Sequence, residues 1–143
     1  MTFDHLGIIV RSLLDGRNFF EATAAYKSWS AVFEDEALGV RVQFGRQASG
    51  PTIELIQPLG KNSPIAATLQ RGVNTLNHLA YRVENLEVSA KTLRLSGCIP
   101  LSPPAPALAY GGALVQFFYS PQKLLLELIR VDSNFSVWGG GNP

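Results

Sequence analysis

The chain has 143 residues, of which 46% are hydrophobic and 16% charged, and its formal net charge is +1. This balance is typical of a folded globular domain rather than a disordered chain. A nearly neutral chain without a basic run has no strong field to attract nucleic acid or an anionic membrane, so we expect neither as a partner. A single cysteine, Cys98, excludes an internal disulfide and fits a reducing compartment. No segment is apolar for long enough to cross a bilayer, and we therefore expect a cytoplasmic protein.

The first part of the chain predicts a strand, a helix and three further strands. An alternating run rich in branched residues predicts a strand over 3–10, and apolar residues at helical spacing predict a helix over 12–27. Turn-prone residues separate three more expected strands, which lie at 28–35, 39–46 and 52–58.

A linker follows at 61–73. It contains the stretch NSPIAATLQ, where we expect Ser63 to cap a short helix with Pro64 at its first position.

The second part of the chain repeats the order of elements. We expect a strand at 76–83 and a helix at 85–97 that ends in a glycine. A proline-rich stretch at 99–107 precedes two strands, expected at 113–120 and 123–130.

An internal repeat explains this order. When the sequence is shifted by 73 residues against itself, matches cluster in three short apolar stretches: His5 on His78, VQF at 42–44 on VQF at 115–117, and ELI at 54–56 on ELI at 127–129. The chain is therefore expected to hold two copies of one β-α-β-β-β unit. We predict one α+β domain at 1–133, with module one at 1–60 and module two at 74–133, whose curved mixed sheets form a cleft. Residues 134–143 are expected to form a loose tail.

Four residues of metal-ligand type occupy matched positions in the two copies. His5 and His78 begin the first strand of each unit, and Glu54 and Glu127 lie in the last strand. A carboxylate in so apolar a strand is costly to desolvate unless something neutralises it, and a divalent cation would do so. If the units pair about a pseudo-twofold axis, two imidazoles and two carboxylates converge. Such mixed nitrogen and oxygen ligands suit Mn, Fe, Co, Ni or Zn better than Ca.

A structural explanation exists for each residue alone. A single histidine in an apolar strand is more often a hydrogen-bonded core residue than a ligand, and a single strand glutamate usually faces solvent. The duplicated spacing of all four residues favours a shared site over four separate structural roles.

The chain resembles the vicinal-oxygen-chelate superfamily, which includes glyoxalase I, extradiol dioxygenases, bleomycin-resistance proteins and methylmalonyl-CoA epimerase. The likeness runs from FDHLGIIV to LLLELIRV, and the stretches GVRVQF, IELIQPLGKNSPIA and NHLAYRVENL are most similar to the epimerase branch. This resemblance implies the glyoxalase-like fold, one divalent ion and a homodimer, with modules that pair within one chain or between chains. It also implies that the ion is held by His5, Glu54, His78 and Glu127.

Two positions depart from the epimerase pattern. Asn77 stands where the epimerases usually carry a histidine before His78. Ala37 stands where they tend to carry an acid, and Glu36 lies one residue earlier, which reverses the facing along a strand.

The resemblance implies a metal-dependent isomerase or epimerase that moves a proton alpha to a carbonyl, with a small molecule such as an acyl-CoA as substrate. We expect Glu127, or Glu54 if it leaves the metal, to be one proton carrier. We expect Glu36 or Glu34 to be the other, although an acidic stretch such as 34–36 is more often a solvated surface turn. Four cations are candidates for contacting an acyl or phosphate group or are ordinary surface charges: Arg41, Arg46, Lys61 and Arg82. The alternatives are a glyoxalase I-like lyase acting on another chelating substrate, and a metal-free, resistance-type binding protein. A dioxygenase is disfavoured, because a fourth protein ligand would crowd its oxygen site.

Overall fold

The computed structural model describes residues 1–72, 76–132 and 134–139. The elements follow one another as β1 (Thr2–Ile9), α1 (Leu13–Ala24), β2 (Ser28–Trp29), β3 (Phe33–Asp35), β4 (Val40–Arg46), β5 (Thr52–Pro58), α2 (Ala66–Arg71), β6 (Leu76–Val83), α3 (Leu86–Leu95), β7 (Ile99–Pro100), β8 (Ala105–Ala107), the 3₁₀ helix η1 (Leu108–Tyr110), β9 (Ala113–Tyr119) and β10 (Leu125–Arg130). Residue 73 of the expected linker, residues 74–75 and 133 of expected module two, and residues 140–143 of the expected tail lie outside the described residues. None of the described helices is long and apolar enough to cross a membrane.

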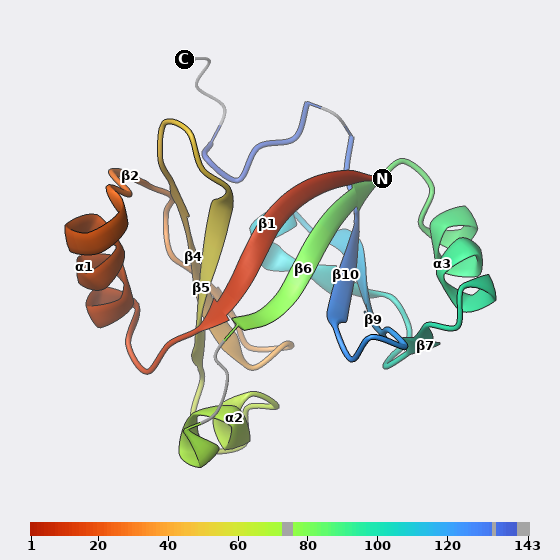
Figure 1. The fold of residues 1–143 in the computed structure, drawn as a ribbon, viewed down its shortest axis with the longest axis horizontal. Helices are drawn as coiled ribbons and strands as arrows, with labels where there is room; N and C mark the ends of the chain where they lie inside the picture. The colour runs from red at the N-terminus through yellow and green to blue at the C-terminus, as the bar shows by residue number, and fades with distance from the viewer. Residues whose placement is uncertain (73–75, 133, 140–143) are drawn as a thin grey trace.

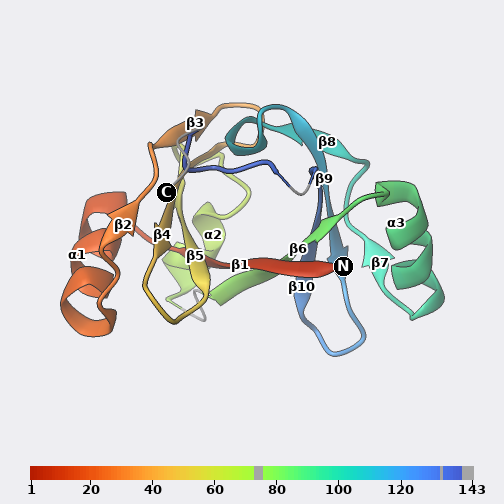
Figure 2. The ribbon, with the colours of Figure 1, turned by 90° about the horizontal axis from the view of Figure 1, so that it is seen from above.

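All strands belong to one mixed sheet, which curls so that its two ends face each other (Figures 1 and 2). The main strand order is β2-β4-β5-β1-β6-β10-β9-β7, with β3 on β4 and β8 on β9. Figure 2 shows α1 and α3 on the outer surface, at opposite sides of the curl. The predicted α+β class with a curved mixed sheet is confirmed.

The two copies of the repeat use the same strand register. In module one Gly7 lies opposite Glu54 across the parallel β1–β5 pair, and in module two Ala80 lies opposite Glu127 across the parallel β6–β10 pair. The antiparallel pairing of β1 with β6 joins the two modules within this one chain. The repeat prediction is therefore confirmed at the level of strand pairing.

The alternation of side chains along β5 and β10 determines which face of the sheet Glu54 and Glu127 point to. Leu55 packs in the apolar cluster under α1, and Leu128 packs in the cluster under α3. Neighbouring side chains in a strand point to opposite faces. Glu54 and Glu127 therefore point to the inside of the curled sheet.

Two stretches differ from the sequence-based expectation. The single strand predicted at 28–35 is interrupted over residues 30–32, and β2 and β3 pair separately with β4. At the start of this break the Ser30 hydroxyl accepts the backbone N–H of Phe44. The proline-rich stretch 99–107 contributes the short strands β7 and β8 on the outer side of β9. Proline is tolerated there because an edge strand leaves some of its N–H positions unpaired.

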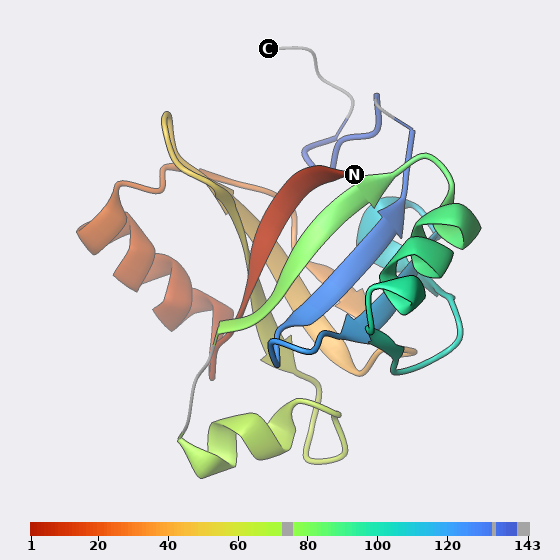
Figure 3. The same cartoon turned by 45° about the vertical axis from the view of Figure 1, so that its right-hand side comes forward.

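The helix between the modules starts later than predicted. The N-cap of α2 is Ile65, which makes no capping hydrogen bond through its side chain, so the predicted Ser63 cap is wrong. The backbone carbonyl of Ser63 accepts the N–H of Ala66 at 3.0 Å, while its hydroxyl is buried without a hydrogen-bond partner. Figures 1 and 3 show α2 beside one end of the β1–β6 pair.

The C-terminal segment packs against the sheet over residues 134–139, so the prediction of a loose tail is wrong for this part. An apolar cluster on the inside of the curl, called the inner cluster below, includes Val42, Ile56 and Val115. Val137 is buried in this inner cluster, and Trp138 packs against it. The guanidinium of Arg46 in β4 lies 4.6 Å from the Trp138 ring centroid. Figure 2 shows the segment crossing from the β9 side of the curl towards the β3–β4 side. The apolar side chains of Phe135, Val137 and Trp138 pack together against the inner cluster, and their burial outweighs the loop-like composition of the segment.

Candidate metal centre

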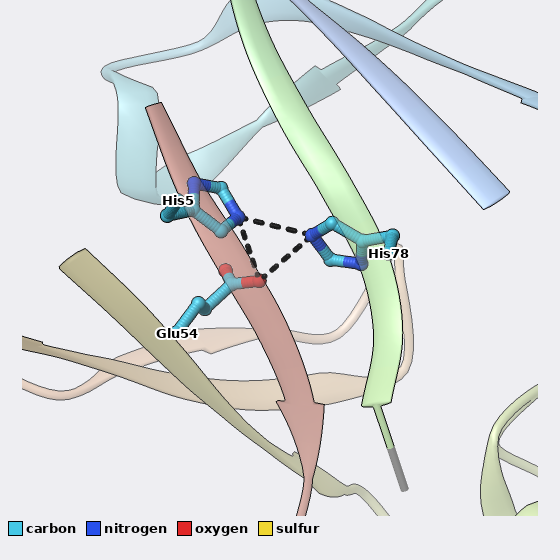
Figure 4. Close-up of side chains that lie close together, drawn as sticks. All are labelled: His5, Glu54 and His78. Atoms are coloured by element: carbon cyan, nitrogen blue, oxygen red, sulfur yellow. Dashed lines mark hydrogen bonds and ion pairs between the residues drawn. The ribbon is translucent and has the colours of Figure 1, made fainter. Parts of the chain in front are cut away.

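Strands β1, β5, β6 and β10 bring the four ligand-type residues to one point inside the curl. His5 Nε2 lies 3.0 Å from His78 Nε2, and Glu54 Oε2 lies 3.3 Å from His5 Nε2 and 3.5 Å from His78 Nε2 (Figure 4). Glu127 Oε2 approaches from the opposite flank, 3.6 Å from His5 Nε2 and 3.3 Å from His78 Nε2. All four side chains are buried.

The separations among His5, Glu54 and His78 fit three ligands of one metal ion, and Glu127 Oε2 lies near both histidines but outside that mutually close group of three. Transition-metal bonds to imidazole nitrogen and carboxylate oxygen are about 2.0 to 2.2 Å long, so neighbouring ligand atoms around one ion lie about 3.0 to 3.5 Å apart. Potential ligand atoms of His5, Glu54 and His78 all lie within 4.8 Å of one another. Two neutral imidazoles and two carboxylates also match the charge of a divalent cation.

A bulge precedes each histidine in the β1–β6 ladder. The register skips Asp4 between Phe3 and His5, and it skips Asn77 on the other strand. Because a bulge turns a side chain away from strict alternation, each skipped residue reaches the ring that follows it. Asp4 Oδ1 lies 2.7 Å from His5 Nδ1, and Asn77 Oδ1 lies 2.9 Å from His78 Nδ1.

A buried polar network surrounds His5 on the side away from the other ligands. Asp4 accepts hydrogen bonds from the Arg82 guanidinium and from the Tyr110 hydroxyl, the latter at 2.8 Å. Burial opposes ionisation of Asp4, but the His5 ring and the Arg82 and Tyr110 donors outweigh it and hold the pKa of the carboxyl well below its usual range. Burial together with the charges of Asp4, Glu127 and Glu54 raises the pKa of Tyr110 well above its usual value, so its hydroxyl stays protonated.

The surroundings of His5 favour positive charge. Burial alone would lower its pKa, but the Glu54 carboxylate, the hydrogen bond from the ring to Asp4 and the Glu127 carboxylate together raise the pKa to about 10 in the protein without a metal ion. A cation is therefore stabilised at this point, whether it is a proton or a metal ion.

A cavity of about 490 Å³ opens onto the centre. Glu54, His78, Glu127 and Tyr110 form its polar end. Most of its other walls are apolar side chains from both modules and from the start of α2, among them Leu38, Val42, Ile56, Ile65, Leu101 and Phe117. Phe117 stands edge-on to the His78 ring, with 5.5 Å between ring centroids. The cavity thus joins a polar, ligand-rich end to a hydrophobic chamber.

The structure does not bring Glu36 to this centre. Glu36 is exposed and is not among the residues that line the cavity, whereas its neighbour Asp35 lines it. The Asp35 carboxylate accepts two backbone N–H groups, from Leu38 and from Leu108, both at 3.0 Å. Asp35 therefore ties the turn after β3 to η1 in the other module.

The cations considered from the sequence lie elsewhere. Arg41 pairs with the exposed Glu34, Arg46 lies over Trp138, and Arg82 binds Asp4. Within the part of the chain that the structure describes, no lysine or arginine side chain lines the cavity.

Sequence reasoning missed Asp4, Tyr110 and the role of Arg82. The repeat itself holds a signal for the first, because Asp4 and Asn77 occupy equivalent positions and both offer a side-chain oxygen. No comparable signal exists for Tyr110, whose counterpart in module one is Ala37.

Comparison with known proteins agrees with this architecture. The family model described as "Glyoxalase/Bleomycin resistance protein/Dioxygenase superfamily" matches residues 4–117. The chain belongs to this superfamily. Among curated proteins it is similar to "Uncharacterized protein YqjC" of Bacillus subtilis (strain 168), with 36% identity over 80 residues, and the match spans 54% of each chain.

Solved structures share the fold over nearly the whole chain. The hypothetical protein BH1468 from Bacillus halodurans C-125 superposes with a TM-score of 0.80 at 26% identity, covering 93% of this chain and 96% of the other. Methylmalonyl-CoA epimerase from Mycobacterium tuberculosis gives a TM-score of 0.75 at 22% identity, with 90% and 86% covered. A Streptomyces coelicolor methylmalonyl-CoA epimerase variant in complex with 2-nitronate-propionyl-CoA gives 0.74 at 22% identity, with 95% and 98% covered. At these identities the epimerase structures establish a common fold.

Proposed function

We propose that the protein is a metal-dependent isomerase that moves a proton on the carbon next to a carbonyl, with epimerisation of an acyl-CoA of the methylmalonyl-CoA type as the leading reaction. The observation that carries the proposal is the convergence of two histidines and two glutamates at the polar end of an apolar cavity. Membership of the superfamily and the shared fold of the epimerases support it.

His5, Glu54, His78 and Glu127 would hold one divalent ion, for which Co, Mn, Ni, Zn and Fe are the candidates. When bound, such an ion acts as a Lewis acid on two substrate oxygens and makes the proton on the carbon between them more acidic.

Epimerisation needs one proton carrier on each face of the reacting carbon. Glu127 comes from β10 and Glu54 from β5, which flank the central β1–β6 pair on opposite sides. We assign Glu127 as the carrier on one face and Glu54 as the carrier on the other. Glu36, the carrier expected from the sequence, would require a rearrangement of the turn after β3 to reach the cavity.

The apolar walls have two roles in this reaction. They bind the hydrocarbon part of the acyl group and so orient the reacting carbon between the two carboxylates. They also keep bulk water from the centre, so that a proton is returned by a carboxylate rather than by solvent.

A proton-exchange screen tests the proposal. Protein loaded in turn with each candidate metal is incubated in deuterated buffer with methylmalonyl-CoA, other acyl-CoA thioesters and 2-oxo compounds, and deuterium at the alpha carbon is measured by mass spectrometry. We expect exchange in at least one substrate, and none with a His5→Ala/His78→Ala double variant. If no metal form exchanges an alpha proton in any of them, the isomerase proposal is wrong.

A cytoplasmic location and a homodimer remain predictions. Sedimentation of the purified protein with and without metal measures the second directly.

A further inference from the structure

We propose that Asp4 is a positioning residue for His5: held by Arg82 and Tyr110, it fixes the ring so that Nε2 presents its lone pair to the metal centre. This inference rests on the proposed function, because it concerns a ligand of the proposed ion. It goes further by assigning a role to a residue that is not itself a ligand.

The Asp4 carboxylate fixes the direction of each hydrogen bond around it. An ionised carboxylate only accepts, so the Tyr110 hydroxyl at 2.8 Å, the His5 Nδ1 at 2.7 Å and the Arg82 guanidinium must all donate to Asp4. The Tyr110 hydroxyl proton is therefore used in the hydrogen bond to Asp4. The Tyr110 oxygen, 3.1 Å from His5 Nδ1, faces that nitrogen with a lone pair.

The surroundings of Nδ1 fix the tautomer of His5. The two atoms nearest to Nδ1, Asp4 Oδ1 and the Tyr110 oxygen, both act as acceptors, so Nδ1 carries the proton. In the neutral ring Nε2 is then unprotonated. Nε2 is the atom that points at His78, Glu54 and Glu127. A second partner that fixes the tautomer and ring orientation is the usual companion of a metal-bound histidine.

Burial shields the Asp4–His5 pair from solvent. The Asp4 side chain is 8% exposed and that of His5 is 0% exposed, so water does not compete for these hydrogen bonds. The Arg82 side chain is 25% exposed, and its Nη1 also donates to the carbonyl of Phe135 at 2.7 Å. The carbonyl of Phe135 in the C-terminal segment thus helps to fix the position of Arg82, which in turn binds Asp4.

The ring of His78 is held differently from that of His5. At the equivalent position His78 has Asn77, a neutral acceptor at 2.9 Å. The position equivalent to Tyr110 is Ala37, which offers no hydroxyl. His5 therefore has an ionised carboxylate as its partner, and that carboxylate accepts three hydrogen bonds, whereas His78 has only a neutral amide oxygen.

Metal affinity and proton NMR together test the role of Asp4. Affinity for Co²⁺ is measured by competition with a chromophoric chelator in the wild type, Asp4→Ala, Asp4→Asn and Tyr110→Phe. Glu34→Gln is the matched control, since it removes a carboxylate from an exposed ion pair with Arg41. We expect Asp4→Ala to weaken Co²⁺ binding by about 10- to 100-fold, Asp4→Asn to recover part of this loss because its amide oxygen still accepts from Nδ1, and Glu34→Gln to change nothing.

The NMR readout separates positioning from a general loss of structure. In the Co²⁺ protein each bound ring gives a strongly shifted, exchangeable N–H signal, and the wild type should show a slowly exchanging one from His5. In Asp4→Ala we expect the His5 signal to exchange rapidly while the His78 signal persists.

The outcomes distinguish the two proposals. Wild-type affinity and a slowly exchanging His5 signal in Asp4→Asn and Tyr110→Phe would overturn the role of Asp4 and leave the metal-dependent function standing. These two variants also decide the question if Asp4→Ala does not fold. Failure of the wild type to bind Co²⁺, Mn²⁺, Ni²⁺, Zn²⁺ or Fe²⁺ would overturn the proposed function, and the positioning role with it.

Discussion

Gly7 lies directly opposite His78 in the β1–β6 ladder, and the imidazole ring occupies the space that a side chain at Gly7 would need. A Cβ on Gly7 would overlap several ring atoms of His78, among them Nε2 at 2.6 Å. Only glycine therefore leaves room for this ring beside β1 with Nε2 in the centre.

Gly7→Ala should displace the His78 ring and weaken metal binding at least tenfold, because one ligand leaves its place. The added methyl group should also lower the free energy of unfolding of the metal-free protein by about 1–3 kcal/mol. Chelator competition and denaturant unfolding measure the two effects. Ala80→Gly is the matched control: Ala80 lies opposite His5, so this change removes a methyl group instead of adding one and should leave the metal in place. Wild-type affinity in Gly7→Ala would show that the ring position is not limited by this contact.

Addition of metal should raise the unfolding temperature of the wild type. A ligand that binds only the folded state at 100 times its Kd contributes about 2.7 kcal/mol, which is several degrees for a chain of this size. His78→Ala removes a nitrogen ligand and should shrink the shift by lowering affinity several-fold or more. The measurement is differential scanning fluorimetry with Mn, Co, Ni and Zn, supported by elemental analysis. No metal in the purified protein and no shift with any of these ions would favour the resistance-type binding protein.

Much of this centre could be predicted from the sequence because it depends on strand periodicity. The repeat places His5 and His78 at equivalent positions, and alternation puts Glu54 and Glu127 on the inner face of the sheet. Neither inference requires knowledge of loops. The same periodicity would not have predicted the contact of Asp4 with His5, because strict alternation points neighbouring side chains to opposite faces. The bulge that redirects Asp4 has no clear sequence signature.

Loops and the terminal segment explain the remaining errors. Which of the acids at 34–36 faces the cavity depends on the two backbone amides that bind Asp35, one of which comes from the other module. The packing of Val137 depends on an inner cluster assembled from distant strands. Such long-range partners are absent from local sequence patterns.

Replacing Glu127 by Gln should separate metal binding from proton transfer. Gln keeps a ligand oxygen but is not a base, so the variant should retain much of its metal and lose exchange of the alpha proton on one face. The expected loss is about 10² or more. Exchange is measured separately from each stereoisomer of the substrate, and Glu54→Gln should lose exchange on the opposite face. If Glu127→Gln exchanges both stereoisomers at the wild-type rate, Glu127 is not a carrier, and the turn at 34–36 becomes the place to look.

The packed C-terminal segment makes a prediction about stability. Val137 is 6% exposed, and Val137→Ala should lower the free energy of unfolding by about 1–3 kcal/mol because it leaves a gap in the inner cluster. Val88→Ala is the same substitution at a position that is 61% exposed on α3, and it should change stability by less than about 0.5 kcal/mol. Equal effects in urea unfolding would mean that the segment does not contribute to the folded core in solution.

The cavity should be needed for the substrate but not for the metal. Ala107 lines the chamber from β8 and is itself buried, so Ala107→Phe would place a ring in space that the acyl group is expected to occupy. We expect this variant to bind Co²⁺ with unchanged affinity, because Ala107 is not among the ligand-type residues, and to exchange the alpha proton at least tenfold more slowly at low substrate concentration. Ala67→Phe on the exposed side of α2 adds the same ring away from the chamber and should behave as the wild type. Isothermal titration with Co²⁺ and deuterium exchange at several substrate concentrations separate the two properties. If Ala107→Phe exchanges substrate as fast as the control, the acyl group lies outside this chamber, and the assignment of the cavity as the substrate site is wrong even where the metal centre is right.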